Sequence, residues 1–432
     1  MTHERTITDQ VDNLLTSRSS DSETPNRTKS LKILVVLEAH PLLPSGAEFR
    51  DRNLIESLSS VGEVCVFLAF DAQQGSAEVV RDRYGVPATG GSSRHTTMVE
   101  GIWNYIRHPS WPWRVARRPV QDARRALTAE IGSWDPHLIV FRHTSTFMTY
   151  DRRLGKPTMV DIDDIDSSVS AQLLRTTTSA SANPLNWLRR LARNLFVRGE
   201  IHRWRHSERV AQRYACTVVA CSQDDALQMR ANGARLVVVA PNGYDRTGPA
   251  MGRQALGEPQ TVGFWGLISY SPNREGAKWF IDSVLPIVRE SIPDIRFAVA
   301  GAGSEQLQAF DPRIECLGRI PAMEPFLINV DVAVVPLLAG GGTRIKIIEA
   351  WAHGIPVVST TIGIHGLDPR PGENALVADT PQDFANAIVQ ALSDTELRGR
   401  LRAGGSLSAR SFLWAAFRKE IANAAVETAA RR

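Results

Sequence analysis

The chain contains 432 residues, of which 43% are apolar and 22% are charged, so its composition excludes collagen-like, wholly disordered and coiled-coil proteins. This length predicts about two to four domains with a sizeable core. A formal net charge of +4 is too small to indicate nucleic acid as the partner. The 4 cysteines are too few for a disulfide framework and show no zinc spacing, so we expect them to be reduced.

Residues 1–30 are polar and carry too little apolar surface to offset the entropy of ordering, so we expect a mobile tail. This segment lacks the apolar region of a secretory signal, and no stretch of about 18 consecutive apolar residues occurs in the chain. We therefore expect a cytoplasmic protein, with peripheral attachment to the inner face of a membrane as an open alternative.

From residue 31 the chain alternates between strand and helix patterns. A continuous apolar run at 32–40 is typical of a buried parallel strand, a helix pattern covers about 47–60, and a second apolar run covers 63–70. The order strand, helix, strand is the signature of a βαβ unit. Further apolar runs recur at 137–141, 157–162, 216–221 and 235–240.

A second alternating series follows a polar, glycine-containing linker at about 242–260, where we place a domain boundary. Its expected strands lie at 261–266, 295–301, 313–318, 330–337 and 356–360. Its expected helices lie at 275–290, 343–353, 383–392 and 406–428. The predicted fold class is therefore α/β, with two doubly wound parallel sheets.

A segment rich in tryptophan and arginine, residues 103–125, lies between two of the expected strands. Aromatic and cationic side chains together are suited to an anionic membrane surface. A solvated arginine-rich helix is the other interpretation of the same residues.

The most informative segment is the glycine run at 340–342, which leads from an expected buried strand into the expected helix at 343–353. Free backbone N–H groups and the positive end of the helix dipole converge there, so we expect an anion such as phosphate. Thr343 is suited to cap the helix. Arg344 and Lys346 oppose the dipole in the first turn unless an anionic ligand compensates, although both side chains could also point into solvent.

Glu349 lies one to two turns further along this expected helix. A carboxylate at that place can accept two hydrogen bonds from the diol of a sugar. A solvated helical glutamate is the alternative interpretation.

The run GGGTRIKIIEAWAHGIPVVST resembles the nucleotide-sugar signature of the retaining GT-B glycosyltransferases of family GT4. Four further segments are similar to the family in serial order, at 219–229, 238–245, 263–280 and 297–304. The resemblance covers roughly residues 31–405. It implies a GT-B fold, in which two Rossmann-like, doubly wound parallel-sheet domains face a central cleft.

The resemblance also implies the domain organisation. Residues 1–30 would be the disordered tail, 31–245 the acceptor-binding domain and 246–405 the domain that binds the nucleotide sugar. Residues 406–432 would form a helix that returns to the first domain.

The resemblance implies that Glu349 binds the ribose hydroxyls, as does the second glutamate of the E-x7-E motif of the family. The first glutamate of that motif would fall at Gly341. Its usual role, positioning the transferred sugar, is then lost or passes to the backbone N–H groups of Gly341, Gly342 and Thr343. Gly46, in the loop after the first strand, would let the backbone approach the donor diphosphate.

The family often places an Arg/Lys pair after the first strand of the second domain, but Leu267 stands near that point in this chain. Arg274, Arg344 and Lys346 are the expected substitutes. A diphosphate leaving group gains negative charge as the glycosidic bond breaks, and cations with N–H dipoles can stabilise it. We therefore expect neither a metal nor a cofactor beyond the nucleotide sugar, which is a co-substrate.

In the family, a histidine near the end of the fourth strand commonly contacts the donor sugar. His143 is the best match, and Arg142 shares the candidacy. The nearby Asp161, Asp163 and Asp164 resemble the metal motif of the other glycosyltransferase architecture, GT-A, whose carboxylates suit Mg or Mn. Because a full second α/β half follows, we expect these aspartates to border the cleft and orient an acceptor hydroxyl, or to cap the next helix.

The implied reaction moves a sugar from a nucleotide-diphosphate donor to the hydroxyl of a glycan, lipid carrier or natural product, with retention at the anomeric carbon. The implied partners are therefore the donor and the acceptor, without nucleic acid. Two alternatives stay open: a sugar-nucleotide 2-epimerase of the same architecture, and a non-catalytic domain that only binds nucleotide.

Overall fold

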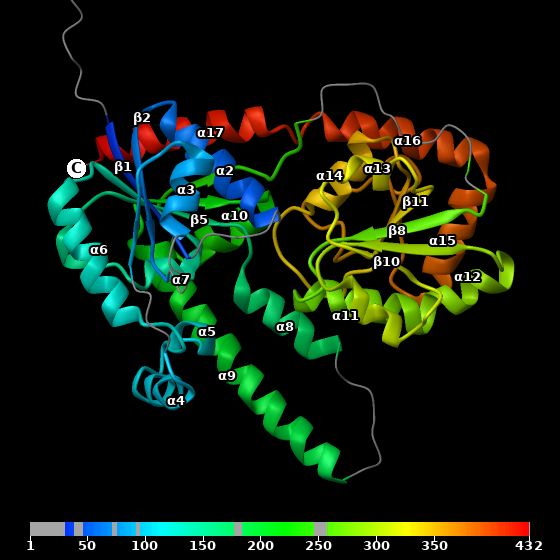
Figure 1. The fold of residues 1–432 in the computed structure, drawn as a ribbon, viewed down its shortest axis with the longest axis horizontal. Coiled ribbons are helices and arrows are strands. Elements are labelled where there is room, and N and C mark those ends of the chain that lie inside the picture. The colour runs from blue at the N-terminus through cyan, green and yellow to red at the C-terminus, as the bar shows by residue number, and fades with distance from the viewer. Residues whose placement is uncertain are drawn as a thin grey trace, which may run out of the picture. The chain divides into compact units, whose positions relative to one another are not determined.

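The computed structural model describes residues 31–38, 46–70, 76–91, 96–176, 184–245, 256 and 258–431. The predicted mobile tail at 1–30 lies outside the described residues. Within the described residues the chain forms two parallel β-sheets with helices between the strands (Figure 1). The prediction of two doubly wound sheets is therefore confirmed.

The first sheet has 7 strands in the order β3-β2-β1-β4-β5-β6-β7, and every neighbouring pair is parallel. The strands are β1 (Leu31–Leu37), β2 (Gly62–Leu68), β3 (Ala88–Gly90), β4 (Leu138–Arg142), β5 (Thr158–Ile162), β6 (Thr217–Ala220) and β7 (Val237–Val239). β3 was not predicted, and neither was the two-residue β13 of the second sheet, Leu376–Val377, because such short strands show no strand pattern.

The helices of this half follow the strands in chain order. They are α2 (Gly46–Ser59), α3 (Ser76–Tyr84), α4 (Met98–Arg107), α5 (Trp113–Ala116), α6 (Val120–Trp134), α7 (His143–Phe147), α8 (Asp166–Thr176), α9 (Pro184–Tyr214) and α10 (Gln223–Ala231). A 3-10 turn, Arg152–Leu154, precedes β5.

The second sheet has 6 strands in the order β10-β9-β8-β11-β12-β13, again all parallel. The strands are β8 (Thr261–Trp265), β9 (Arg296–Ala300), β10 (Glu315–Gly318), β11 (Val332–Val335), β12 (Val357–Ser359) and β13 (Leu376–Val377). The helices are α11 (Ser271–Trp279), α12 (Leu285–Ser291), α13 (Glu324–Leu327), α14 (Ile345–Ala352), α15 (Pro381–Ser393), α16 (Thr395–Ala409) and α17 (Trp414–Ala430), with a π-helical turn at Phe280–Val284 and a 3-10 helix at Ser304–Ala309.

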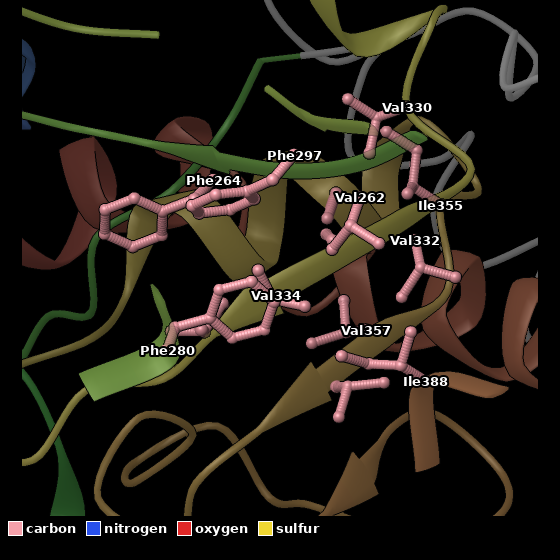
Figure 2. Packing of buried hydrophobic residues seen from close by; sticks show 14 of the residues in the cluster. Val262, Phe264, Phe280, Phe297, Val330, Val332, Val334, Ile355, Val357 and Ile388 are labelled. Atoms are coloured by element: carbon pink, nitrogen blue, oxygen red, sulfur yellow. The ribbon is translucent and has the colours of Figure 1, made fainter. Parts of the chain in front are cut away.

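The central strands β8, β11 and β12 of the second sheet are buried on both faces, as their continuous apolar sequences predict. Phe264, Phe280 and Phe297 have no exposed surface, and the rings of Phe280 and Phe297 lie 4.6 Å apart between centroids. Figure 2 shows these rings beside the valines of β8 and β11. This core fixes the strand ends from which the candidate site is built.

The chain end was predicted as one helix at 406–428, and this prediction is wrong at its start. Residues up to Ala409 belong to α16, and α17 begins only at Trp414. Trp414, Phe417 and Ile421 of α17 belong to the same buried cluster as Ile33 and Val140 of the first sheet. The last helix therefore packs on the half of the chain that holds β1 and β4.

Candidate functional site

The glycine run lies in the loop between β11 and α14, where the chain passes close to the segment after β5. Gly340 and Gly342 have φ values of +149° and +65°, a region that side-chain-bearing residues rarely adopt. A Cβ atom at Gly342 would lie 2.2 Å from the carbonyl oxygen of Asp163, and one at Gly341 would lie 3.1 Å from Oδ1 of Asp164. The close approach of the two segments therefore requires glycine at 342.

The expected helix after the glycines begins two residues later than predicted. α14 starts at Ile345, and its N-cap is Arg344, whose side chain makes no capping hydrogen bond. Thr343 does not cap the helix, which corrects the sequence-based expectation. Its hydroxyl accepts a 2.9 Å hydrogen bond from the backbone N–H of Asn242, and its carbonyl accepts a 3.3 Å bond from Asn242 Nδ2.

The side chain of Arg344 is buried, with 9% of its residue surface exposed. Nη1 donates a 3.3 Å hydrogen bond to the carbonyl oxygen of Gly342. Nε and Nη2 are also buried and have no hydrogen-bond partner among the described residues. Buried N–H donors without a partner are costly, so this guanidinium is suited to receive an anionic ligand.

Lys346 is the second residue of α14, and its side chain reaches across to α11. Its Nζ donates a 2.8 Å hydrogen bond to Asn273 Oδ1 and lies 4.2 Å from the centroid of the Phe264 ring. Burial and the charge of Arg344 lower the pKa of Lys346 to about 7, although Glu349 acts in the opposite direction. A bound anion would favour the charged form of this lysine.

Glu349 lies on the same helix, α14, three residues after Lys346. The indole Nε1 of Trp265, at the end of β8, donates a 2.7 Å hydrogen bond to Glu349 Oε2. No hydrogen bond to Oε1 occurs within the described part of the chain. Burial raises the pKa of Glu349 to about 7, against the hydrogen bond from Trp265 and the charge of Lys346.

On the side of the first sheet, Arg142 and His143 follow one another at the end of β4. Arg142 is only 1% exposed and donates from Nε to Asp51 Oδ1 at 2.7 Å and from Nη2 to Asp163 Oδ2 at 2.6 Å. His143 has a φ of +69°, and its Nδ1 lies 3.0 Å from Asp163 Oδ1. A histidine in this backbone region is uncommon and is a pointer to a functional position.

The neighbouring charges shift the pKa values of His143 and Asp163 in opposite directions. Burial alone would lower the pKa of His143, as does Arg142, but Asp163 and Glu38 raise it above its usual value. Burial alone would raise the pKa of Asp163, but Arg142 and His143 hold it well below its usual range. Asp163 is therefore a carboxylate that favours the protonated form of His143.

The other two aspartates of the D-x-D run have different surroundings. Asp161 has no exposed surface, and both of its oxygens accept hydrogen bonds from Arg50, at 2.9 and 2.6 Å. The structure thus does not bring Asp161 to a surface where an acceptor could reach it. Asp164 accepts a 3.0 Å hydrogen bond from the hydroxyl of Tyr270, and burial with the charge of Asp163 raises its pKa to about 6, opposed mainly by Arg344.

The candidate residues of the two halves are joined by direct contacts. Besides the Tyr270–Asp164 bond, the N–H of Gly340 donates a 2.7 Å hydrogen bond to Gln172 Oε1 in α8. Asn242, which follows β7, bonds to Thr343. The carboxyl ends of parallel strands in both sheets therefore contribute to one place, as is usual for ligand sites of α/β proteins.

Two further predicted donor-binding residues, Gly46 and Arg274, lie in the first turns of helices. Gly46 is the first residue of α2, and the loop before it, at 39–45, lies outside the described residues. Arg274 lies in the first turn of α11 with 44% of its side chain exposed, and its Nη2 is 3.5 Å from Glu275 Oε1. Arg274 follows Asn273, whose Oδ1 accepts the hydrogen bond from Lys346 Nζ, but no hydrogen bond or ion pair joins Arg274 itself to the glycine bend within the described residues.

Glu38, at the end of β1, is a charged residue that the sequence analysis did not single out. Its carboxylate accepts hydrogen bonds from Arg114 at 2.6 Å, from Arg118 at 2.9 Å and from Ser145 at 3.2 Å. Burial alone would raise the pKa of Glu38, but the arginines and His143 lower it to about 2. Its position directly after a buried strand could have marked it in the sequence, because ligand sites of α/β proteins lie at the carboxyl ends of the strands.

Within the described ranges, no group of three or more His, Cys, Asp or Glu side chains is arranged to hold a metal ion. The carboxylates of the D-x-D run pair with Arg50 and Arg142 instead. None of the described helices combines the length and apolar character that spanning a membrane requires.

Comparison with solved structures identifies the fold. Sucrose-phosphate synthase from Thermosynechococcus elongatus superposes with a TM-score of 0.67 at 16% identity, covering 93% of this chain and 100% of that chain. HepE from Anabaena, solved in complex with UDP and glucose, gives a TM-score of 0.61 at 18% identity, covering 91% of this chain and 99% of that chain. Together with the two parallel sheets, these likenesses show the GT-B fold.

The sequence comparisons agree with this fold. Residues 259–394 match the family described as Glycosyl transferases group 1. The phosphatidyl-myo-inositol mannosyltransferase of Mycobacterium leprae (strain TN) is 29% identical over 210 residues, which are 45% of this chain and 54% of that protein. The chain thus spans about half, or less, of the length of the curated relatives it matches. These matches support a glycosyltransferase enzyme.

Proposed function

We propose that the chain is a glycosyltransferase that moves a sugar from a nucleotide-diphosphate donor to an acceptor hydroxyl, with retention at the anomeric carbon. The observation that carries the proposal is the buried guanidinium of Arg344, whose Nε and Nη2 lack partners among the described residues, beside the amine of Lys346. Two cations at the start of one helix, next to a glycine bend, form an environment suited to a diphosphate.

In this proposal, the residues of the second half hold the donor. The N–H groups of Gly341, Gly342 and Thr343 face the diphosphate and the transferred sugar, and Glu349 accepts hydrogen bonds from the ribose hydroxyls. Arg344 and Lys346 stabilise the charge that develops on the leaving diphosphate, so the reaction needs no metal. The match of residues 259–394 to a glycosyltransferase family supports this assignment.

The residues of the first half take the acceptor side in the same proposal. His143, held by Asp163, faces the donor sugar, and Asp164 orients the acceptor hydroxyl from its place beside the glycine bend. Asp161 is left out of this set because its carboxylate is occupied by Arg50. A cytoplasmic location belongs to the proposal as well.

Two measurements on the full chain test the proposal. A thermal-shift screen against nucleoside diphosphates and their sugars identifies the donor, because a ligand bound only by the native state raises the Tm. The stabilising nucleotide sugar is then incubated with and without a panel of hydroxyl acceptors, and the anomeric products are followed by NMR. We expect an α- or β-product that keeps the donor configuration.

Conversion of the donor without any acceptor would instead indicate an epimerase. Tight nucleotide binding without turnover on any acceptor would indicate a binding domain. An inverted product would contradict retention while leaving the glycosyltransferase assignment intact.

A further inference from the structure

Helix α4 carries its apolar side chains on the face that points away from the protein. Val99, Trp103 and Ile106 are 76%, 60% and 66% exposed, and Met98 and Ile102 are exposed as well. These positions recur at spacings of three and four residues, so they lie on one face of the helix. A surface helix ordinarily turns such a face toward the core, and α4 does the opposite.

The orientation of α4 is fixed by contacts on its other face. A Cβ atom at Gly101 would lie 3.0 Å from the side chain of Arg117, and Asn104 Nδ2 donates a 3.2 Å hydrogen bond to the carbonyl oxygen of Ala116. Thr97 and Glu100 form a reciprocal capping box at the start of the helix. Helix α4 therefore packs on the protein through small and polar residues, and this leaves its apolar face pointing outward.

Helix α9 holds the other end of α4 and extends the apolar surface. Arg203 Nη1 donates hydrogen bonds to the carbonyl oxygens of Tyr105, His108 and Trp111, at 2.9, 3.0 and 3.0 Å. The ring of Phe196 lies 5.9 Å from that of Tyr105, and Phe196 is 45% exposed (Figure 1 shows α4 and α9). Leu195, its neighbour, is 60% exposed.

The charges around this surface are mostly positive, with Glu100 of α4 as an acidic exception that is engaged in the capping box. Exposed arginines near it include Arg107 at the end of α4 and Arg189, Arg193 and Arg198 on α9. The acidic residues of α9 are both engaged with the protein interior: Glu200 accepts a 2.8 Å hydrogen bond from the N–H of Trp113, and Glu208 accepts bonds from Ser167. Exposed cations beside an apolar stripe favour an anionic partner.

We propose that the α4–α9 surface, defined by Val99, Ile102, Trp103, Ile106, Leu195 and Phe196, lies against an anionic lipid bilayer. The apolar side chains enter the interface between headgroups and acyl chains, and the arginines contact the lipid phosphates. A second copy of the chain is the poorer occupant, because a two-fold interface would bring two equally positive surfaces together. This proposal does not depend on the proposed donor site, whose residues lie on other elements.

Vesicle sedimentation with the full chain tests this proposal. We expect binding to vesicles that contain phosphatidylglycerol, weak binding to phosphatidylcholine alone, and release at high salt, where surface charges are screened. Trp103→Ser combined with Ile106→Ser should weaken the binding at least about tenfold, since each buried apolar side chain contributes on that order. The matched control is Leu227→Ser with Leu407→Ser, two residues that are 61% and 57% exposed elsewhere.

The charge contribution is tested in the same assay. Replacing Arg107 and Arg193 by glutamine should weaken binding roughly fivefold for each arginine. Arg319→Gln, an exposed arginine after β10, is the control and should bind as the unaltered chain does.

Three results would overturn the proposal: no binding of the unaltered chain, equal binding to both vesicle types, or equal loss in the control variants. A dimer in sedimentation velocity that dissociates on Trp103→Ser with Ile106→Ser, without vesicle binding, would assign the surface to a second copy instead. Vesicle binding is measured without nucleotide, so failure of the proposed glycosyltransferase activity would not change these outcomes.

Discussion

The indole nitrogen of Trp265 and Oε2 of Glu349 lie 2.7 Å apart, in a hydrogen bond that connects the end of β8 to the middle of α14. The bond fixes Oε2 of the buried carboxylate, and because the carboxylate is planar this also restricts where Oε1 points. Trp265 is itself held by an edge-on contact with Phe326, at 5.9 Å between ring centroids. In the proposed site, Trp265 is therefore a positioning residue that acts through Glu349.

Replacing Trp265 by phenylalanine removes this donor and keeps an aromatic ring against Phe326. We expect the affinity for the nucleoside diphosphate found in the thermal-shift screen to fall about two- to tenfold, the size of one net hydrogen bond. Calorimetry on the purified variant measures the change. An affinity equal to that of the unaltered chain would show that the orientation of Glu349 does not depend on the indole.

The variant Glu349→Ala tests the proposed ribose contact directly. Hydrogen bonds to a charged group contribute about 1.5–3 kcal/mol each, so we expect nucleotide binding to weaken by at least about tenfold while the fold is kept. Glu349→Gln is the matched control, because it keeps the shape and one acceptor oxygen, and it should lose less. If Glu349→Ala binds nucleotide as tightly as the unaltered chain in calorimetry, the ribose role is wrong.

Arg344 and Lys346 should matter most for the transfer step. We expect Arg344→Ala with Lys346→Ala to lower kcat by about 100-fold or more, since removing one stabilising donor of this kind typically has that effect. Arg274→Ala should change kcat much less, because its side chain is exposed and pairs with Glu275. Circular dichroism accompanies the kinetics, and unfolding of the double variant would indicate that these cations are structural instead.

The strands, the glycine bend and the basic start of the following helix could be predicted from the sequence, because apolar runs and glycines act locally. The partners of the candidate residues could not. Trp265 and Glu349 are 84 residues apart, and Asn242 and Thr343 are 101 apart, so no local pattern joins them. Asp161 was predicted to face the acceptor for the same reason. Arg50, which binds its carboxylate, lies 111 positions away in the sequence, so no local pattern showed that this carboxylate is already paired.

The capping role predicted for Thr343 failed for a related reason. A threonine before a helix usually bonds to the first backbone N–H groups. In the structure its hydroxyl instead accepts from Asn242, a tertiary contact that overrides the local preference. The N-terminal N–H groups of α14 thus receive no side-chain cap from Arg344 or Thr343, which is consistent with the proposed anion at this place.

The lowered pKa of Lys346 leads us to expect that nucleotide binding is coupled to the uptake of a proton. Its pKa is lowered from 10.5 to about 7, so between these pH values the folded state binds fewer protons than the unfolded state, and the contribution of Lys346 to the free energy of unfolding rises with pH. A bound diphosphate raises this pKa, so at about pH 8 we expect binding to take up a proton and to strengthen as the pH falls toward 7. Calorimetry in buffers of different ionisation enthalpy measures the uptake. Lys346→Met should reduce the uptake to the part that Glu349 contributes, while Arg274→Ala should leave it unchanged. An unaltered chain that takes up no proton would place the diphosphate away from this lysine.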